Sequence, residues 1–208
     1  MTEAEWLSSN DPAAMLAHLD GRVSRRQLLL FACACARGWD NPAAERGVEL
    51  GERLADGKFR ERDWRKLFPP VPADLLAQLP FNFDFGLIQQ LINPRNIGDM
   101  TAQFAALRAE GQPRARRALL RRQARFLREV VGNPFHHPEL PEAVRTFEGG
   151  LIGRLAEAIY EEQDYARLGV LGDALEEAGA DAALAEHCHD EGPHVRGCWV
   201  IDLILGKA

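Results

Sequence analysis

The sequence predicts an all-α protein, folded as an irregular bundle of several helices. Capping signals recur along the chain, and apolar residues repeat at helical spacing in most segments between prolines. The one segment that alternates apolar and polar residues, 81–85, is too short to found a sheet. With 208 residues, of which 46% are hydrophobic, the chain is long enough to bury a core of its own.

Helix-start signals define the elements of the N-terminal region. Thr2 with Glu5 and Ser24 with Gln27 have the spacing of capping boxes, while Asp11 and Asn41 each precede a proline suited to the first helical position. These signals predict helices over 3–9, 11–20, 24–38 and 42–55. The third helix is apolar on every face between Leu28 and Ala36, so we expect it to be buried.

Prolines and glycines divide the rest of the chain. We expect one domain over 1–208, in which lobes 1–68 and 99–208 are joined by a proline-rich middle, 69–98. A helical pattern runs from Pro113 to Val131, and Gly132-Asn133-Pro134 ends it. Further helices are predicted over 142–162, 164–178, 181–189 and 194–206.

Composition predicts a cytoplasmic protein without a membrane segment. No stretch approaches the roughly 20 apolar residues that a membrane span needs, and the first residues are acidic where a secretory signal is basic and apolar. The four cysteines, Cys33, Cys35, Cys188 and Cys198, are too few to suggest a disulfide framework in a chain of this size. We therefore expect reduced thiols. The net charge of −6 argues against a generally basic, nucleic-acid-binding surface.

Charge is distributed unevenly along the chain. Seven arginines lie between Pro113 and Val131, and five of them fall within roughly 80° of one another on a helix. We call these five the arginine stripe: Arg114, Arg117, Arg121, Arg125 and Arg128. Between Glu157 and Glu191, by contrast, eleven acidic residues accompany one base, Arg167. The stripe could be a solvated face paired with the acidic helices, an interface with a partner or a second copy, or a contact for phosphates.

A second candidate site is a group of possible metal ligands near the C-terminus: His187, Cys188, His194 and Cys198. Imidazole and thiolate are good zinc ligands, and His194 and Cys198 are four apart, on one face of the predicted last helix. The cysteines, however, lack the closely paired spacing of zinc knuckles, and Gly192-Pro193 also reads as an ordinary helix start. Zinc or iron, in a structural or hydrolytic role, is thus one alternative. The other is no metal at all.

Motifs of known catalytic classes are absent from the sequence, which favours a role other than catalysis. It contains no glycine-rich phosphate loop, no Gly-x-Ser-x-Gly elbow, no His-Glu-x-x-His and no dinucleotide fingerprint. We therefore assign no catalytic residue. Apart from the zinc alternative, we expect no cofactor.

Blocks at both ends of the chain carry a resemblance to a known family. They are Met1–Leu7 (MTEAEWL), Leu30–Cys35 (LFACAC) and Gly192–Val200 (GPHVRGCWV). With them the chain resembles a family of uncharacterised planctomycete proteins. The resemblance implies a bacterial, intracellular origin and implies no activity.

These observations lead to three functional hypotheses. The first is a protein-interaction or scaffolding module that uses the basic helix surface (114–128) and the acidic helices (157–191) to bind a protein partner or a second copy. The second is a metal-binding protein with its ligands between residues 187 and 198. The third is nucleic-acid binding through the arginine stripe.

Overall fold

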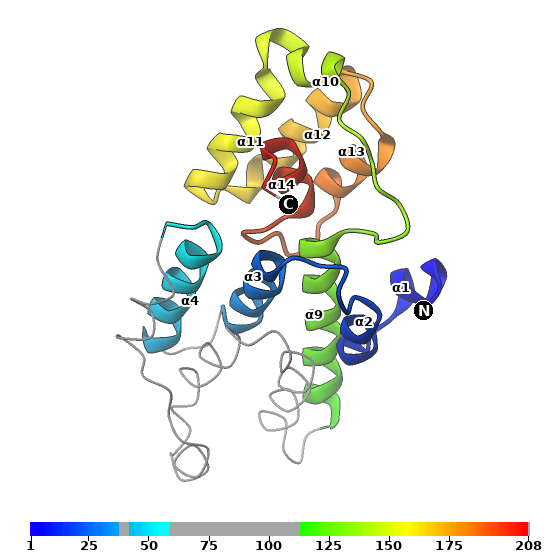
Figure 1. Cartoon of the computed structure of the whole chain (residues 1–208), viewed down its shortest axis with the longest axis vertical. Helices are drawn as coiled ribbons and strands as arrows, with labels where there is room; N and C mark the ends of the chain where they lie inside the picture. The colour runs from blue at the N-terminus through cyan, green and yellow to red at the C-terminus, as the bar shows by residue number, and fades with distance from the viewer. Residues whose placement is uncertain (38–41, 59–112, 208) are drawn as a thin grey trace. The chain divides into compact units, whose positions relative to one another are not determined.

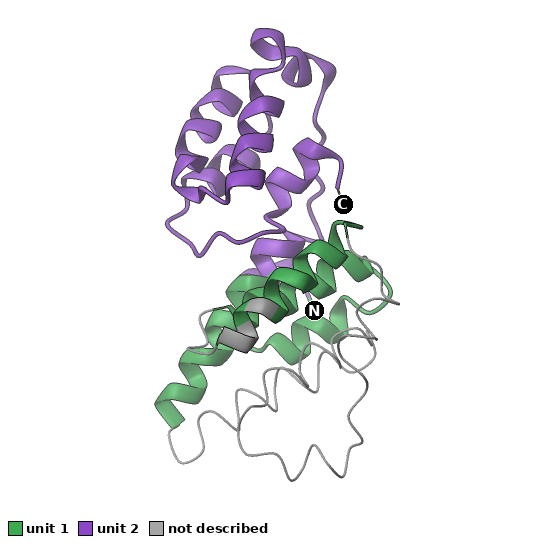
Figure 2. Ribbon diagram, turned by 90° about the vertical axis from the view of Figure 1, so that its left-hand side faces the viewer, with its two compact units in different colours: residues 1, 9–127 green, residues 2–8, 128–208 purple. Residues whose placement is uncertain are grey.

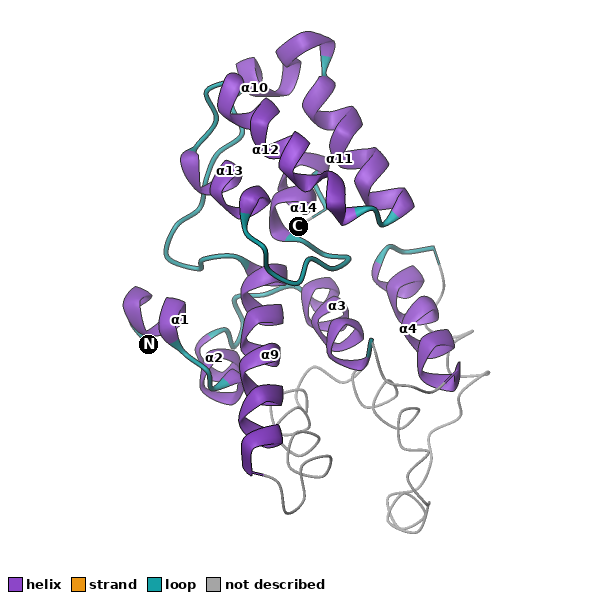
Figure 3. Cartoon of the chain, turned by 180° about the vertical axis from the view of Figure 1, so that it is seen from behind, coloured by secondary structure: helices purple, strands orange, loops and turns teal. Residues whose placement is uncertain are grey.

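The part of the chain that the structure describes is α-helical. A computed structural model describes residues 1–37, 42–58 and 113–207 (Figure 1). Within these ranges helices follow one another and no β-strand occurs (Figure 3). The predicted all-α class is therefore confirmed. The predicted junction at 69–98 and the alternating segment at 81–85 lie outside the described residues.

The N-terminal helices begin where their capping signals predicted. They are α1 (Glu3–Ser8), α2 (Pro12–His18), α3 (Arg25–Ala36) and α4 (Pro42–Ala55). The Asp11 side chain accepts hydrogen bonds from the backbone N–H groups of Ala13 and Ala14. Ser24 and Gln27 form a reciprocal capping box, as predicted.

The chain divides into two compact units, which Figure 2 colours separately. Unit 1 comprises residue 1 and residues 9–127, and unit 2 comprises residues 2–8 and 128–208. The division falls within the long helix α9 (Pro113–Val131), whose last residues therefore belong to unit 2.

Unit 1 contains the buried helix that the sequence predicted. In α3, Leu29 to Ala34 are all buried, and this helix packs against α4. The two helices approach closely at Gly51, where an added Cβ would lie 2.7 Å from Cys33 Sγ. Cys33 donates a long hydrogen bond of 3.8 Å to the Val48 carbonyl. The Cys33 thiol is therefore part of the packed core.

Unit 2 holds a helical core built from the C-terminal region. Its main helices are α10 (Glu142–Thr146), α11 (Leu151–Glu162), α12 (Leu168–Glu177), α13 (Ala182–His189) and α14 (Trp199–Leu205). Helix α11 packs against α12 and α14, and α12 packs against α13. Residues such as Ile159, Leu171, Leu184 and Ile201 fill the space between these helices.

The single helix predicted over 142–162 is wrong, because the chain leaves helical geometry in the middle of that range. Helix α10 is followed by a short 3₁₀ turn, η2 (Phe147–Gly149), before α11 begins. Glu148, Gly149 and Gly150 have φ values of 44°, 65° and 86°, in the left-handed region. The two glycines take up this conformation without the Cβ clash that other residues meet. The break turns α11 into a separate helix.

The predicted start of the last helix is also wrong, and this affects the candidate ligands. Helix α14 begins at Trp199 rather than at residue 194. Before it, Val195 to Cys198 form a turn closed by a 3.0 Å hydrogen bond from the Cys198 N–H to the Val195 carbonyl. Gly197, with φ of 94°, occupies the third position of this turn, as a type II turn requires. His194 and Cys198 therefore lie in a loop rather than on one helical face.

Among the described residues, none of the helices combines the length and the apolar character that crossing a bilayer requires.

Candidate metal centre

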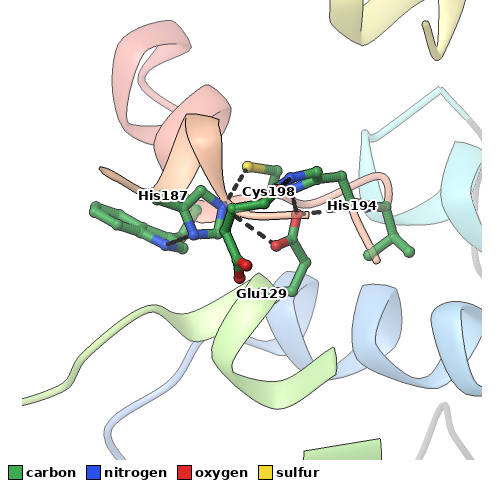
Figure 4. A network of polar contacts seen from close by, with 7 residues as sticks. Glu129, His187, His194 and Cys198 are labelled. Carbon is green, nitrogen blue, oxygen red and sulfur yellow. Dashed lines mark hydrogen bonds and ion pairs between the residues drawn. The ribbon is translucent and has the colours of Figure 1, made fainter. Parts of the chain in front are cut away.

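Four side chains from three segments of unit 2 point toward one another (Figure 4). Glu129 comes from the end of α9, His187 from α13, and His194 and Cys198 from the loop before α14. One ligand atom from each residue lies within 4.8 Å of the ligand atoms of the other three. We call these four residues the candidate metal site.

Local backbone features bring these segments to one place. Helix α9 ends at Val131 because Gly132 follows in the left-handed conformation, with φ of 74°. A Cβ on Gly132 would lie 3.0 Å from the Trp199 ring, so glycine here also lets Trp199 pack against the helix end. The turn at Gly197 then places Cys198 directly before Trp199. The end of α9 and the start of α14 are thus held next to each other.

The polar contacts at the site are centred on the Glu129 carboxylate. His187 Nε2 lies 3.2 Å from Glu129 Oε2 and also 3.2 Å from Cys198 Sγ. His194 Nδ1 lies 3.3 Å from Glu129 Oε1, which also accepts a 3.4 Å hydrogen bond from the Val195 N–H. The carboxylate therefore has a polar neighbour on each oxygen.

Because the site is buried, the protonation of Glu129 and that of His194 depend strongly on each other. Glu129 is 5% exposed, and burial acts to raise its pKa, yet the hydrogen bonds from His187 and His194 outweigh burial and lower it. For His194, burial acts to lower the pKa, but the hydrogen bond and charge of Glu129 raise it above its ordinary value. Without a metal, Glu129 is therefore a buried carboxylate that favours a protonated His194.

Cys198 is a thiol in the metal-free site. Burial, followed by the nearby Glu129 charge, raises its pKa well above the ordinary value. A divalent ion reverses this situation, because a metal ligand must be the thiolate. Loading of a metal would therefore release the Cys198 proton.

The donor atoms suit a tetrahedral zinc ion in kind, charge and spacing. Two imidazole nitrogens, one carboxylate oxygen and one thiolate sulfur are all ligands that zinc takes in proteins. Metal bonds of about 2.0–2.1 Å place neighbouring N and O donors of a tetrahedron about 3.3 Å apart. In the metal-free site, His187 Nε2 lies 3.2 Å from Glu129 Oε2 and His194 Nδ1 lies 3.3 Å from Glu129 Oε1, so each imidazole is at this distance from a different oxygen of the carboxylate. One carboxylate and one thiolate would also neutralise the charge of a divalent ion.

The structure brings together three of the four predicted metal ligands and adds one that was not predicted. Cys188 does not join the site: it is 3% exposed and part of the unit 2 core, where burial and the Glu129 charge raise its pKa to about 12. It neighbours His187 on α13, and successive helical residues point about 100° apart. Glu129 lies with the other three side chains in place of Cys188.

Glu129 was missed because it lies 65 residues before His194 in the sequence. A local signal was nevertheless present. Glu129 is the one acidic residue between Pro113 and Val131, and it falls on the apolar side of that helix with Phe126 and Val130. An acidic residue on a buried face needs a compensating partner, which marks it as a candidate site residue.

The arginine stripe is mostly exposed, with one exception. Arg114, Arg117, Arg121 and Arg125 are exposed on α9. Arg128 is half-buried, and its guanidinium donates a 3.0 Å hydrogen bond to the Trp6 carbonyl within unit 2. The outward-facing stripe therefore comprises four of the five predicted residues.

Comparisons of the chain with protein-family models, with curated proteins and with solved structures find no match.

Proposed function

We propose that this protein binds one divalent transition-metal ion, zinc by its ligand chemistry, at Glu129, His187, His194 and Cys198. The observation that carries the proposal is the convergence of four different ligand side chains within 4.8 Å. The donor distances and the charge balance described above support zinc in particular. The metal hypothesis thus becomes the leading one, with Glu129 in place of Cys188.

The role of the ion is structural. Four protein ligands complete a tetrahedral zinc site and leave no open position for a water or substrate. The ligands come from the end of α9, from α13 and from the loop before α14, so one ion would tie three segments of unit 2 together. The reduced Cys198 thiol that this role needs agrees with the predicted cytoplasmic location and with the free state of all four cysteines.

The direct test is the metal content of the protein purified without a histidine tag and without chelator. We expect about one zinc ion per chain by elemental analysis. After removal of the metal, a titration against a coloured zinc chelator should give the same stoichiometry. Protein that neither retains nor rebinds zinc or iron would contradict the proposal, and stoichiometric iron would correct the choice of metal.

Matched variants distinguish a site from adventitious binding. His194→Ala and Cys198→Ala each remove a ligand and should abolish stoichiometric binding. His189→Ala and Cys188→Ala remove the same residue types from positions outside the site. If these two controls lose zinc to the same degree as the ligand variants, the ligand assignment is wrong.

A second candidate function is binding of an acidic protein surface by the arginine stripe. Four exposed arginines line one side of α9, and no acidic residue precedes Glu129 in that helix. The chain itself offers a complementary surface, because ten of the eleven acidic residues between Glu157 and Glu191 are exposed. This supports self-association of two copies through opposite charges, which salt would weaken.

Sedimentation at low and high salt tests the second candidate. We expect association at low salt that the triple reversal of Arg117, Arg121 and Arg125 to Glu abolishes. Reversal of Glu157 and Glu177 to Lys should have the same effect, and combining both sets should restore association. A monomer under all conditions would contradict self-association, and salt-dependent binding of RNA or DNA instead would support the nucleic-acid hypothesis.

A further inference from the structure

One hydrogen bond fixes which ring nitrogen of His187 carries the proton. The Trp199 indole Nε1 lies 3.1 Å from His187 Nδ1, within hydrogen-bonding distance. An indole N–H can only donate, so His187 Nδ1 must accept. A neutral His187 therefore carries its proton on Nε2, where the Glu129 carboxylate accepts it at 3.2 Å.

The Nε2 atom is also the one that would bind the metal. A metal ion can bind only a ring nitrogen that carries no proton. When Nε2 of a neutral His187 binds the metal, the imidazole proton must therefore be on Nδ1. Two donors, the Trp199 N–H and the His187 Nδ1–H, would then face each other. The indole–imidazole hydrogen bond must therefore break when the site is loaded.

His194 presents the opposite arrangement. Its Nε2 lies 2.9 Å from the Asp190 carbonyl, which can only accept, so this nitrogen carries a proton. Its Nδ1 faces Glu129 and the site. A ligating histidine usually donates its second N–H to a carbonyl or carboxylate in this way. When a metal displaces the proton on its Nδ1, His194 is left in the tautomer of a metal ligand, whereas His187 is held in the other tautomer.

Packing keeps Trp199 in place against His187. The two ring centroids are 5.2 Å apart, with the planes tilted by 60°. The Trp199 ring also lies against Gly132, where an added Cβ would be 3.0 Å from the Trp199 Cγ and Cδ2 atoms. The indole N–H is therefore aimed at Nδ1 by the end of α9 and the start of α14 together.

We propose that Trp199 is a positioning residue that opposes metal binding by holding His187 in the tautomer with its proton on Nε2. The inference rests on the metal site proposed above. Loading exchanges the indole–imidazole hydrogen bond for a metal–nitrogen bond, and the His187 proton passes through solvent from Nε2 to Nδ1. Trp199 thereby lowers the affinity of the site and makes its metal easier to release.

The test is the zinc affinity of Trp199→Phe, measured against a competing chelator at one fixed pH. Phenylalanine keeps an aromatic ring but removes the donor, so the metal-free state no longer gains the hydrogen bond that loading must break. Loss of one neutral hydrogen bond from the metal-free state should therefore increase the zinc affinity about two- to twelvefold. Trp6→Phe is the matched control, because the Trp6 indole N–H donates to the Gly132 carbonyl instead of to a ligand. It should leave the zinc affinity unchanged.

The outcomes separate this inference from the proposal beneath it. If neither the parent chain nor Trp199→Phe binds zinc, the proposed function fails. If both bind zinc and Trp199→Phe binds equally or more weakly, the role of Trp199 is overturned.

A measurement on the unaltered chain does not depend on how the variant folds. ¹⁵N NMR of the histidine rings should report a proton on Nε2 of His187 in the metal-free protein and on Nδ1 after zinc is added. A proton on Nδ1 of His187 in the metal-free protein would overturn the inference.

Discussion

Two buried cysteines, one in each unit, are equally buried but have different neighbours. Cys33 in unit 1 and Cys198 in unit 2 are each 1% exposed, and burial is the main reason why the pKa of each thiol is raised. Cys33 packs between α3 and α4, with its sulfur near the Val48 carbonyl. Cys198, in contrast, has the His187 imidazole 3.2 Å from its sulfur and Glu129 and His194 nearby.

The comparison shows that burial and a raised thiol pKa do not identify a metal site. A buried thiol is a common core group, equivalent to a small apolar side chain. Among the described residues, the donor atoms converge at Cys198 and not at Cys33. Several ligand side chains brought together from distant segments are therefore the stronger indication of function.

The largest expected difference between the two cysteines is in zinc binding. Cys198→Ala should weaken zinc binding by more than about 100-fold, since even residues that only support the ligands cost 10–100-fold when altered. Zinc at 100 times its dissociation constant should stabilise the parent chain by about 2.7 kcal/mol, and Cys198→Ala should lose that gain. Cys33→Ala should keep both the zinc affinity and the stabilisation by zinc. Chelator competition measures the zinc affinity, and thermal unfolding with and without zinc measures the stabilisation. If Cys33→Ala and Cys198→Ala lose zinc affinity equally, the two cysteines do not differ in metal binding.

Acidification should weaken zinc binding. The pKa of Cys198 and that of His194 are both raised in the metal-free chain, so both groups hold protons that the metal must displace. The affinity should fall about tenfold per pH unit from the Cys198 proton alone, and more steeply where His194 is also protonated. Titrations at several pH values, corrected for the chelator, measure this slope. An affinity that does not change with pH would exclude the thiolate as a ligand.

Among the described residues, the buried carboxylates Glu129 and Glu52 should also differ in the metal-free protein. Glu129→Gln leaves buried imidazole and backbone donors without their anionic partner, which should cost about 1–3 kcal/mol in the free energy of unfolding. Glu52→Gln should cost less than about 1 kcal/mol, because its partner Arg37 is 45% exposed and stays hydrated. Urea denaturation of the chelator-treated variants measures both values. A larger loss at Glu52 would mean that Glu129 has little role in holding unit 2 together.

A variant in unit 1 tests the packing of Cys33. Gly51→Ala places a Cβ 2.7 Å from Cys33 Sγ, and overpacking of this kind costs about 1–3 kcal/mol, partly offset by the higher helix propensity of alanine. The double variant with Cys33→Ala should recover most of the loss. Urea denaturation of the single and double variants gives the coupling energy. If the free-energy changes of the two substitutions simply add in the double variant, Gly51→Ala and Cys33 do not compete for the same space.

Local signals predicted the helices well but not their interruptions. Capping residues such as Asp11 and Ser24 mark helix starts because their side chains bond the first free N–H groups. The break at Gly149-Gly150 was missed, because two glycines lower helix propensity without forbidding a helix. Gly192-Pro193 suggested a helix start that the turn at Gly197 displaced to Trp199.

The candidate site was predictable only as far as its residues are close in sequence. His187, His194 and Cys198 lie within twelve positions and carry ligand chemistry of their own. Glu129 joins them through tertiary structure, since the Trp199 ring packs against the end of α9 at Gly132. Pairing between segments so far apart depends on how side chains fit together, which one sequence does not reveal.

X-ray absorption at the zinc edge of the loaded protein identifies the ligand atoms themselves. A zinc ion bound by these four side chains should have one sulfur ligand at about 2.3 Å and three nitrogen or oxygen ligands at about 2.0–2.1 Å. The sulfur contribution should disappear in Cys198→Ser and persist in Cys188→Ser. A spectrum with no sulfur ligand, with two or more sulfurs, or with the ligation of a fully hydrated ion would contradict a site built from Glu129, His187, His194 and Cys198.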